Sequence, residues 1–361
     1  MASEPRSRTT RFAREPVPAS PESPSHSNGG ASVGAISAAP GSGRPGSVRP
    51  ASPLIGRGPR FSFNQVFSAV LWGSALIVLL ALGGLILLMG HGGWQAFVTF
   101  GPGFLVSAVW NPVTNQYGAL APLLGTVLST LIAVCIAVPM AFGTAFWLTA
   151  IAPRRLAGGL STAVQLLAAV PSIIFGMWGF FLIVPFMARV IQPFLNHHFD
   201  HVPVLKALLC GPPFGSGLMT TGLVLAVMIA PFITAVMCDV FEAVPPMLKE
   251  SAYGLGATRW EVMRYVVAPW SRSGMIGAVV LGMGRALGET MAVTFVIGNV
   301  TAIGWSLFVP RTTVASLIAL QFPESPAGSL RLSSLMALGF ILMALSCLSL
   351  ILARYLRRQR A

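Results

Sequence analysis

Two oppositely charged residues lie inside an apolar stretch that is long enough to cross a bilayer. Residues 273–298 are mostly Gly, Ala, Val, Met and Leu, yet Arg285 and Glu289 stand near the middle. A charge at that depth is costly and is by default a functional hypothesis. Arg donates a rigid fork that suits oxyanions, whereas an ionised Glu can only accept hydrogen bonds. The pair therefore predicts either a path for a polar solute or an ion pair that only holds helices together.

The spacing of this pair predicts that both side chains share one helix face. Positions four apart are neighbours on an α-helix, so Arg285 and Glu289 would lie one turn apart. A stripe of small residues follows the same helical period: Gly274, Ala278, Gly282 and Ala292. Such a stripe lets helices pack closely or leaves room for a solute.

The composition indicates a membrane protein. Of 361 residues, 54% are hydrophobic and 9% are charged, whereas about 25% of the residues of a soluble domain are charged. The net charge of +13 comes without aromatic interleaving or a nucleic-acid motif, which argues against a nucleic-acid partner. The four cysteines are widely spaced and form no CxxC pair, so neither a disulfide framework nor a metal site is expected, and the sequence predicts no cofactor in this chain. No arrangement of residues typical of a catalytic site stands out, and we expect that this chain is not an enzyme.

Six apolar runs predict an all-α integral membrane fold with six spanning helices, because about 20 apolar residues cross the hydrocarbon core. The expected helices are 66–90, 119–148, 160–188, 217–241, 273–298 and 331–353. They make up a transmembrane domain, residues 61–361. Residues 1–60 contain ten Pro, eleven Ser, eight Gly and eight Arg, a composition typical of a disordered tail.

Lys and Arg set the orientation. With the N-terminus inside, the inner side holds twelve of these residues and the outer side four. The positive-inside rule therefore predicts that both termini are cytoplasmic. The segment 312–320 is apolar but too short to span, and we expect a re-entrant or interfacial helix there.

The inner loop 242–272 carries a concentrated set of charges. Pro245 and Pro246 suit a helix start, a helical pattern follows, and Pro269 is expected to end it. Two short helices joined at glycine could offer a knob to a partner, or could only anchor the bundle at the membrane face.

The spacing inside this loop resembles the EAA loop of ABC importer permeases. The matching positions are Glu250, Ala252, Gly256 and Pro269, with Ser251 in place of the middle Ala and Ala268 in place of the usual Leu. In that family the loop docks in a groove of the ATPase subunit. The resemblance implies that Glu250, Ser251, Ala252, Gly256, Ala257 and Pro269 couple this chain to an ATPase.

The segment GRALGETMAV (284–293) resembles the fifth helix of phosphate permeases of the PstC type. Further matches are PSIIFGMWG (171–179), FVIGN (295–299) and TTVASLIALQF (312–322), and the resemblance runs from about residue 66 to the end. It implies the type I ABC importer permease fold, a phosphate path at Arg285, Glu289 and Thr290, and a location in the bacterial cytoplasmic (inner) membrane.

The same resemblance implies a set of partners. These are a second homologous permease, two ATPase subunits that bind ATP, and an extracytoplasmic phosphate-binding protein. No G-x-x-x-x-G-K-[ST] loop occurs in this chain, so ATP would bind to the ATPase subunits. The alternatives are a permease for another oxyanion, an ion-coupled secondary transporter or channel, and a phosphate-sensing scaffold.

Overall fold

The structure is a computed structural model that describes residues 63–199, 202–304 and 306–358. The chain divides into two units, Met1–Phe61 and Ser62–Ala361, and all described residues belong to the second. The predicted tail, residues 1–60, lies outside them. Within the described ranges the fold is all α, and the strand-like contacts are two isolated bridges.

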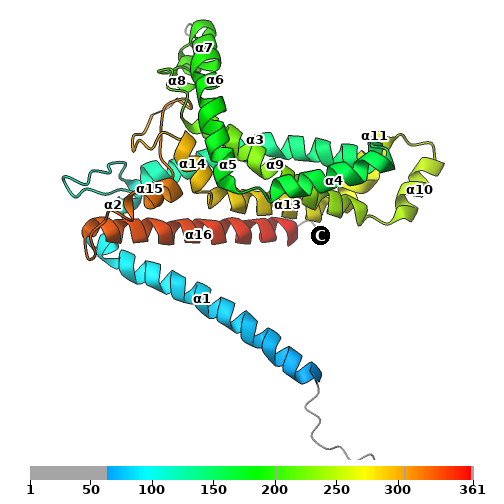
Figure 1. Cartoon of the computed structure of the whole chain (residues 1–361), viewed down its shortest axis with the longest axis horizontal. Helices are drawn as coiled ribbons and strands as arrows, with labels where there is room; N and C mark the ends of the chain where they lie inside the picture. Colours follow the sequence, from blue (N-terminus) through cyan, green and yellow to red (C-terminus); the bar gives the residue numbers. More distant parts are fainter. Residues whose placement is uncertain (1–62, 200–201, 305, 359–361) are drawn as a thin grey trace, which may run out of the picture. The chain divides into compact units, whose positions relative to one another are not determined.

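The helices differ widely in length, and four short π-helical turns, η1 to η4, interrupt or extend them (Figure 1). In chain order the elements are α1 (Phe63–Phe100), α2 (Gly103–Val106), α3 (Leu120–Phe146), η1 (Trp147–Ile151), α4 (Arg154–Ala168), α5 (Ser172–Trp178), η2 (Gly179–Ile183), α6 (Val184–Phe186), η3 (Met187–Ile191), α7 (Gln192–Phe199), α8 (Pro203–Leu209), α9 (Leu218–Glu242), α10 (Pro246–Gly254), α11 (Arg259–Val262), η4 (Met263–Val267), α12 (Ala268–Trp270), α13 (Arg272–Leu287), α14 (Met291–Val296), α15 (Val314–Gln321) and α16 (Leu330–Arg358).

The core forms around α3 and α9, which pack along their length. Four alanines of α3 at intervals of four are fully buried: Ala133, Ala137, Ala141 and Ala145. Residues four apart share a helix face, and small side chains let two helix backbones approach closely. Helices α4 and α13 pack on α9 as well, and α1 packs on α16.

Five helical stretches are long and apolar enough to cross a membrane, and a sixth counts if a bent pair is one span. The predicted ranges 119–148, 217–241 and 331–353 fall on α3 with η1, on α9 and on α16. Helix α1 extends ten residues beyond the predicted end of the first span, residue 90, to Phe100. The short segment predicted at 312–320 is α15.

The prediction of one third helix over 160–188 is wrong. Helix α4 ends at Ala168, and the next helical stretch runs from Ser172 to His198. Pro171 separates them with an extended backbone, ψ 133°. Proline has no N–H to donate and its ring clashes with the carbonyl four residues before it, which favours a break of the helix at this position.

Four other prolines each follow a π turn, whereas Pro139 and Pro231 lie inside α3 and α9 without one. Each of η1 to η4 ends two residues before a proline: Pro153, Pro185, Pro193 and Pro269. In a π turn the hydrogen bond reaches back five residues, which widens the helix locally. The wider turn makes room for the proline ring, and in the last three cases the helix continues past it.

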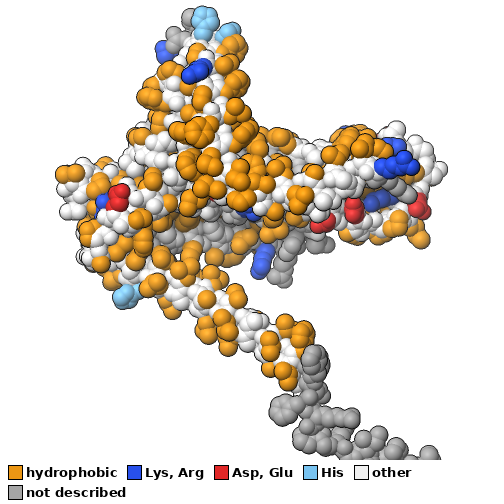
Figure 2. Space-filling model, in the orientation of Figure 1, with side chains coloured by type: hydrophobic (Ala, Val, Ile, Leu, Met, Phe, Trp, Pro, Cys, Tyr) orange, Lys and Arg blue, Asp and Glu red, His pale blue; other side chains and the backbone are white. Residues whose placement is uncertain are grey.

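The charged and apolar surfaces separate along the bundle. Figure 2 shows most of the visible acidic side chains, together with basic ones, over the end formed by α10 and α11, whereas hydrophobic side chains cover the long helices. The opposite end carries α2 and α15 (Figure 1). This arrangement places the predicted coupling loop opposite two of the predicted outer loops, 91–118 and 299–330, while α7 and α8 of the third stand apart at the top of the view (Figure 1).

Candidate translocation path and coupling surface

The fifth predicted span is broken beside its charged residues. Helix α13 ends at Leu287, Gly288 is its C-cap, and α14 begins only at Met291. Glycine at 284 and 288 weakens the helix here, since Gly is about 1 kcal/mol less favourable than Ala in a helix interior. The prediction of one helix over 273–298 is therefore wrong, and Glu289 and Thr290 lie in the break.

Glu289 has a local structural role in this break. Its Oε1 accepts a hydrogen bond from the Ala292 backbone N–H at 3.3 Å. One of the free N–H groups at the start of α14 is thereby satisfied by a carboxylate, which the positive end of a helix favours. Thr290 is the N-cap of α14, and its hydroxyl donates to the Gly288 carbonyl at 3.4 Å. The break thus holds a half-buried carboxylate and a hydroxyl.

Arg285 lies on the last turn of α13 and is exposed in the single chain. Its guanidinium carbon stands 5.7 Å from the centre of the Phe232 ring on α9, a cation–π contact. Within the described residues no ion pair joins Arg285 to Glu289. The prediction that the two share one face of a continuous helix is wrong, and the printed contacts of both side chains are to neutral groups, the Phe232 ring and the Ala292 N–H.

The small-residue stripe serves helix packing. A Cβ added to Gly282 would lie 2.5 Å from Ile233 Cγ1, and one added to Gly274 would lie 2.5 Å from Val240 Cγ1. Both of those side chains belong to α9. Ala278 is fully buried between the same helices. The stripe therefore packs α13 against α9. This packing positions the last turn of α13, which carries Arg285, relative to the core.

The predicted coupling loop folds as α10, a glycine turn, and the run α11–η4–α12. Gly256 has φ +88°, a left-handed conformation that favours glycine, and the Ala257 N–H donates to the Ala252 carbonyl at 3.1 Å. Ala252 and Ala257 pack against the core. Of the other predicted coupling residues, Glu250, Ser251, Gly256 and Pro269 are exposed.

Two features of this loop were not predicted. Met247 and Leu255 expose 75% and 91% of their surface, so the tip presents apolar side chains beside Glu250. Thr258 and Glu261 form a capping box that starts α11. The spacing T-x-x-E carries that signal in the sequence. Pro269, which is expected to end the helical run, is the second residue of α12, and the run ends one residue later at Trp270.

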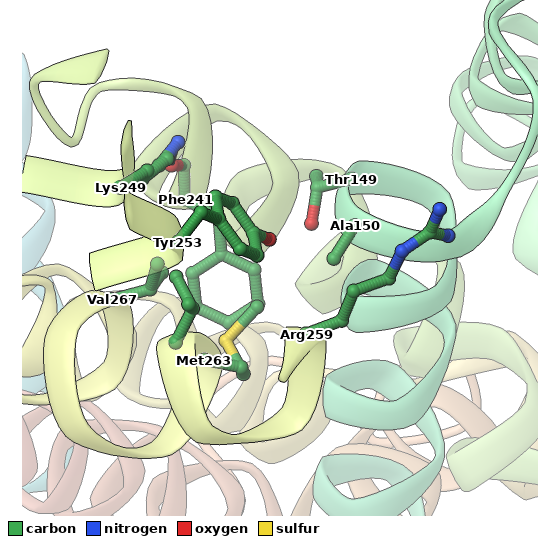
Figure 3. A pocket seen from close by; sticks show the side chains of 9 residues that line it. Thr149, Ala150, Phe241, Lys249, Tyr253, Arg259, Met263 and Val267 are labelled. Carbon is green, nitrogen blue, oxygen red and sulfur yellow. Dashed lines mark hydrogen bonds between the residues drawn. The ribbon is translucent and has the colours of Figure 1, made fainter. Parts of the chain in front are cut away.

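The coupling loop is tied to two spanning helices around a cavity of about 190 Å³ (Figure 3). Lys249 Nζ donates to the Phe241 carbonyl near the end of α9 at 2.8 Å. Arg259 Nη1 donates to the Ile151 carbonyl at the end of η1 at 3.3 Å. Cationic side chains at a helix C-terminus donate hydrogen bonds to the free carbonyls and interact favourably with the negative end of the helix dipole. Burial lowers the pKa of Lys249, and the carboxylate of Glu242 partly offsets that effect.

The fold has counterparts among solved transporters. A bacterial alginate ABC transporter in complex with an alginate pentasaccharide-bound periplasmic protein has a TM-score of 0.55 at 15% identity, with 82% of this chain and 95% of that chain covered. A second structure of an alginate importer has a TM-score of 0.51 at 17% identity and covers 82% and 96%. At such identity these likenesses show the fold alone.

Sequence comparison gives the family. Residues 137–361 match the family of binding-protein-dependent transport system inner membrane components. The phosphate transport system permease protein PstC of Mesorhizobium japonicum is 51% identical over 298 residues, 82% of this chain and 91% of that protein. The protein of the same name from Haemophilus influenzae is 51% identical over 78% of this chain and 88% of its own length. This chain therefore belongs to the family of binding-protein-dependent transport system inner membrane components, within its group of PstC-type permeases.

Proposed function

We propose that this chain is a permease subunit of an ATP-driven, binding-protein-dependent importer that moves inorganic phosphate across the bacterial cytoplasmic membrane. The proposal rests on the break at 288–290 inside a predicted span, which holds Glu289 and directly follows the turn of α13 that carries Arg285. Among the described residues neither charge forms an ion pair. The relatives' shared name, phosphate transport system permease, supports the choice of solute.

The chemistry of the break suits phosphate. Near neutral pH phosphate is an anion that keeps at least one O–H. The Arg285 fork can donate to two phosphate oxygens, which gives short, charge-assisted hydrogen bonds. The ionised carboxylate of Glu289 can accept only, so it favours an anion with a proton to donate over fully ionised sulfate. The Thr290 hydroxyl can donate or accept.

The partners follow from the exposed tip and from the family. The exposed residues Met247, Glu250 and Leu255 lie on and beside α10. In this proposal they dock into a groove on an ATPase subunit. In this proposal two such subunits bind and hydrolyse ATP, and a second homologous permease completes the path. A phosphate-binding protein docks at the end that carries α2 and α15, and both termini are cytoplasmic.

Reconstitution of this chain with the partner subunits encoded in the same genome tests which solute is transported. Uptake of radioactive phosphate into proteoliposomes should be inhibited by unlabelled phosphate and arsenate, because both keep an O–H. Sulfate and molybdate, which carry none at neutral pH, should leave uptake unchanged. Equal inhibition by sulfate would reject phosphate selectivity, and an ATP-driven complex that moves a different oxyanion would support the alternative oxyanion permease.

A further inference from the structure

A closed loop follows α14 at the outer end of the fifth span. Its neck is a short parallel bridge between Gly298 and Arg311. The Arg311 N–H donates to the Ile297 carbonyl at 2.9 Å, and the Val300 N–H donates to the Arg311 carbonyl at 3.1 Å. Gly298 and Asn299 both have positive φ, +91° and 55°, and so reverse the chain. We call the described residues of this segment, 298–304 and 306–311, the Arg311 loop.

The side chain of Arg311 is the unusual feature of this loop. Only 3% of its surface is exposed. One terminal nitrogen donates to the Gly304 carbonyl of the same loop. Its Nε is buried without a hydrogen-bond partner, and among the described residues no carboxylate forms an ion pair with it. Burial lowers its pKa, yet an arginine remains protonated at neutral pH.

A buried guanidinium without an anion is energetically costly. Buried charges are normally paired, and an unpaired buried charge costs several kcal/mol. A neutral carbonyl compensates this only in part, since hydrogen bonds between two charged groups are about twice as strong as neutral ones. The site therefore favours exchange of the carbonyl for an anion. A carboxylate of a docked protein could not reach a side chain that is 97% covered, whereas a small anion needs only a local opening.

The short helix α14 separates the loop from the charged break. Helix α14 connects Glu289 to Ile297, whose carbonyl anchors the backbone of Arg311. Six helical residues span about 9 Å. An anion that enters from this end would meet Arg311 roughly one short helix before it meets the break.

We propose that the guanidinium of Arg311 is an outer binding site for a tetrahedral oxyanion, which the Gly304 carbonyl occupies until the anion replaces it. The site would add a second anion-binding position to the phosphate path, and this inference rests on the proposed function. When the anion arrives, the terminal nitrogen of Arg311 releases the Gly304 carbonyl, and segment 300–304 of the loop opens. The guanidinium then donates to two anion oxygens through its terminal nitrogens and the unpartnered Nε.

Asn299 adds selectivity to this site. Its Oδ1 is buried without a hydrogen-bond partner, while its Nδ2 donates to the Thr294 carbonyl at 2.8 Å. The backbone hydrogen bond from Val300 to Arg311 holds Asn299 beside the same neck. An amide oxygen can only accept, so it would accept the O–H of phosphate and receive nothing from sulfate.

A fluorophore on the loop tests the proposal in the assembled importer without ATP. Ile303 is 46% exposed and adjoins Gly304. In a background without the four native cysteines, Ile303→Cys carries an environment-sensitive dye, and inorganic phosphate or sulfate is titrated at constant ionic strength. Phosphate should shift the emission with saturation, and sulfate should require at least tenfold higher concentration.

Variants of Arg311 distinguish an anion-binding site from an arginine that only stabilises the loop. Arg311→Met should show the shifted emission without phosphate and no further response. Arg311→Lys keeps the charge but loses the fork, so its half-saturating phosphate concentration should rise about tenfold. Arg331→Gln, which removes an outer arginine paired with Glu324 at 3.6 Å, should respond like the parent.

Two results would overturn the site. One is an emission that does not respond to phosphate in the parent, and the other is a response that persists in Arg311→Met. Phosphate uptake is measured on the same preparations. Loss of uptake in the parent rejects the proposed function, whereas normal uptake in Arg311→Met with an unchanged loop response rejects this inference alone.

Discussion

Arg285 and Glu289 show what residue types alone can predict. Their charge inside an apolar stretch identified them as functional candidates, and that reasoning needs no geometry. Their arrangement could not be predicted in the same way. The helical spacing assumed a continuous helix, whereas Gly288 ends α13 and the Glu289 carboxylate caps α14. A side chain that caps a helix beside a glycine competes with the helical ladder, and its energy depends on local packing.

The double role of Glu289 permits a sharp test of its charge. Glu289→Gln keeps an oxygen that accepts from the Ala292 N–H but removes the negative charge. We expect uptake to continue with weaker discrimination against sulfate, by roughly 10-fold or more, since hydrogen bonds to charged groups contribute about 1.5–3 kcal/mol. Glu289→Ala removes the cap as well and should also lower thermal stability.

Competition by sulfate against radioactive phosphate uptake measures this discrimination. The matched control is Glu324→Gln, which removes an exposed carboxylate outside the break. Unchanged selectivity in Glu289→Gln, together with unchanged uptake in Arg285→Lys, would remove these two residues from the path.

The sequence predicts the small-residue stripe on the fifth span but allows two purposes for it, close helix packing or room for a solute. The structure resolves that choice, because Gly274 and Gly282 face side chains of α9 at distances that leave no room for a solute. Sequence gives the period of such a stripe but not the partner helix. The same limit applies to the prolines: Pro171 separates two helices, whereas Pro269 lies inside one behind a π turn.

Gly282→Ala tests the packing of α13 on α9. The added Cβ would lie 2.5 Å from Ile233 Cγ1, and overpacking of this kind costs about 1–3 kcal/mol. Thermal unfolding in detergent should show a lower midpoint. Gly277→Ala on the same helix meets no atom within 4 Å, so its midpoint should stay equal or rise. A lower midpoint for Gly277→Ala alone would contradict the assigned face.

Lys249 tests how the coupling loop is joined to the spans. Lys249→Met removes the hydrogen bond to the Phe241 carbonyl at the end of α9. We expect fewer phosphate ions moved per ATP hydrolysed, about a twofold to fivefold drop for the loss of a bond of ~1 kcal/mol. Lys249→Arg should recover most of the ratio.

Arg264→Met is the control for this experiment. It removes a cation of the same loop that lies over the Tyr265 ring and outside the cavity. If both variants lower the transport-to-ATP ratio equally, the loss of a positive charge explains the effect. The hydrogen bond from Lys249 to the Phe241 carbonyl would then have no specific role in coupling.

At the scale of the whole molecule, composition and apolar runs predicted the fold class well. Four of the six expected spans lie on α1, α3, α9 and α16, because long apolar runs have few alternatives in a bilayer. The third and fifth differ, and both contain the short-range breakers Pro171 and Gly288 near apolar residues. A run of apolar letters does not show whether such a breaker bends, widens or ends a helix.

The two ends of the molecule should lie on opposite sides of the membrane. In a background without native cysteines, Leu255→Cys should react with an impermeant maleimide only after the membrane is opened. Val113→Cys should react in intact spheroplasts. Both side chains are about 90% exposed, so access to the reagent is not limited by the fold. Labelling of Leu255→Cys in intact spheroplasts would reverse the orientation.

The central claim is that this chain works as the permease of an ATP-driven phosphate importer. Its most direct test is the initial rate of phosphate uptake into proteoliposomes that contain this chain, its partner permease, the ATPase subunits and the binding protein. We predict uptake that requires enclosed ATP and stops when the ATPase is made catalytically inactive. Phosphate uptake driven by an ion gradient alone, without ATP, would contradict the account.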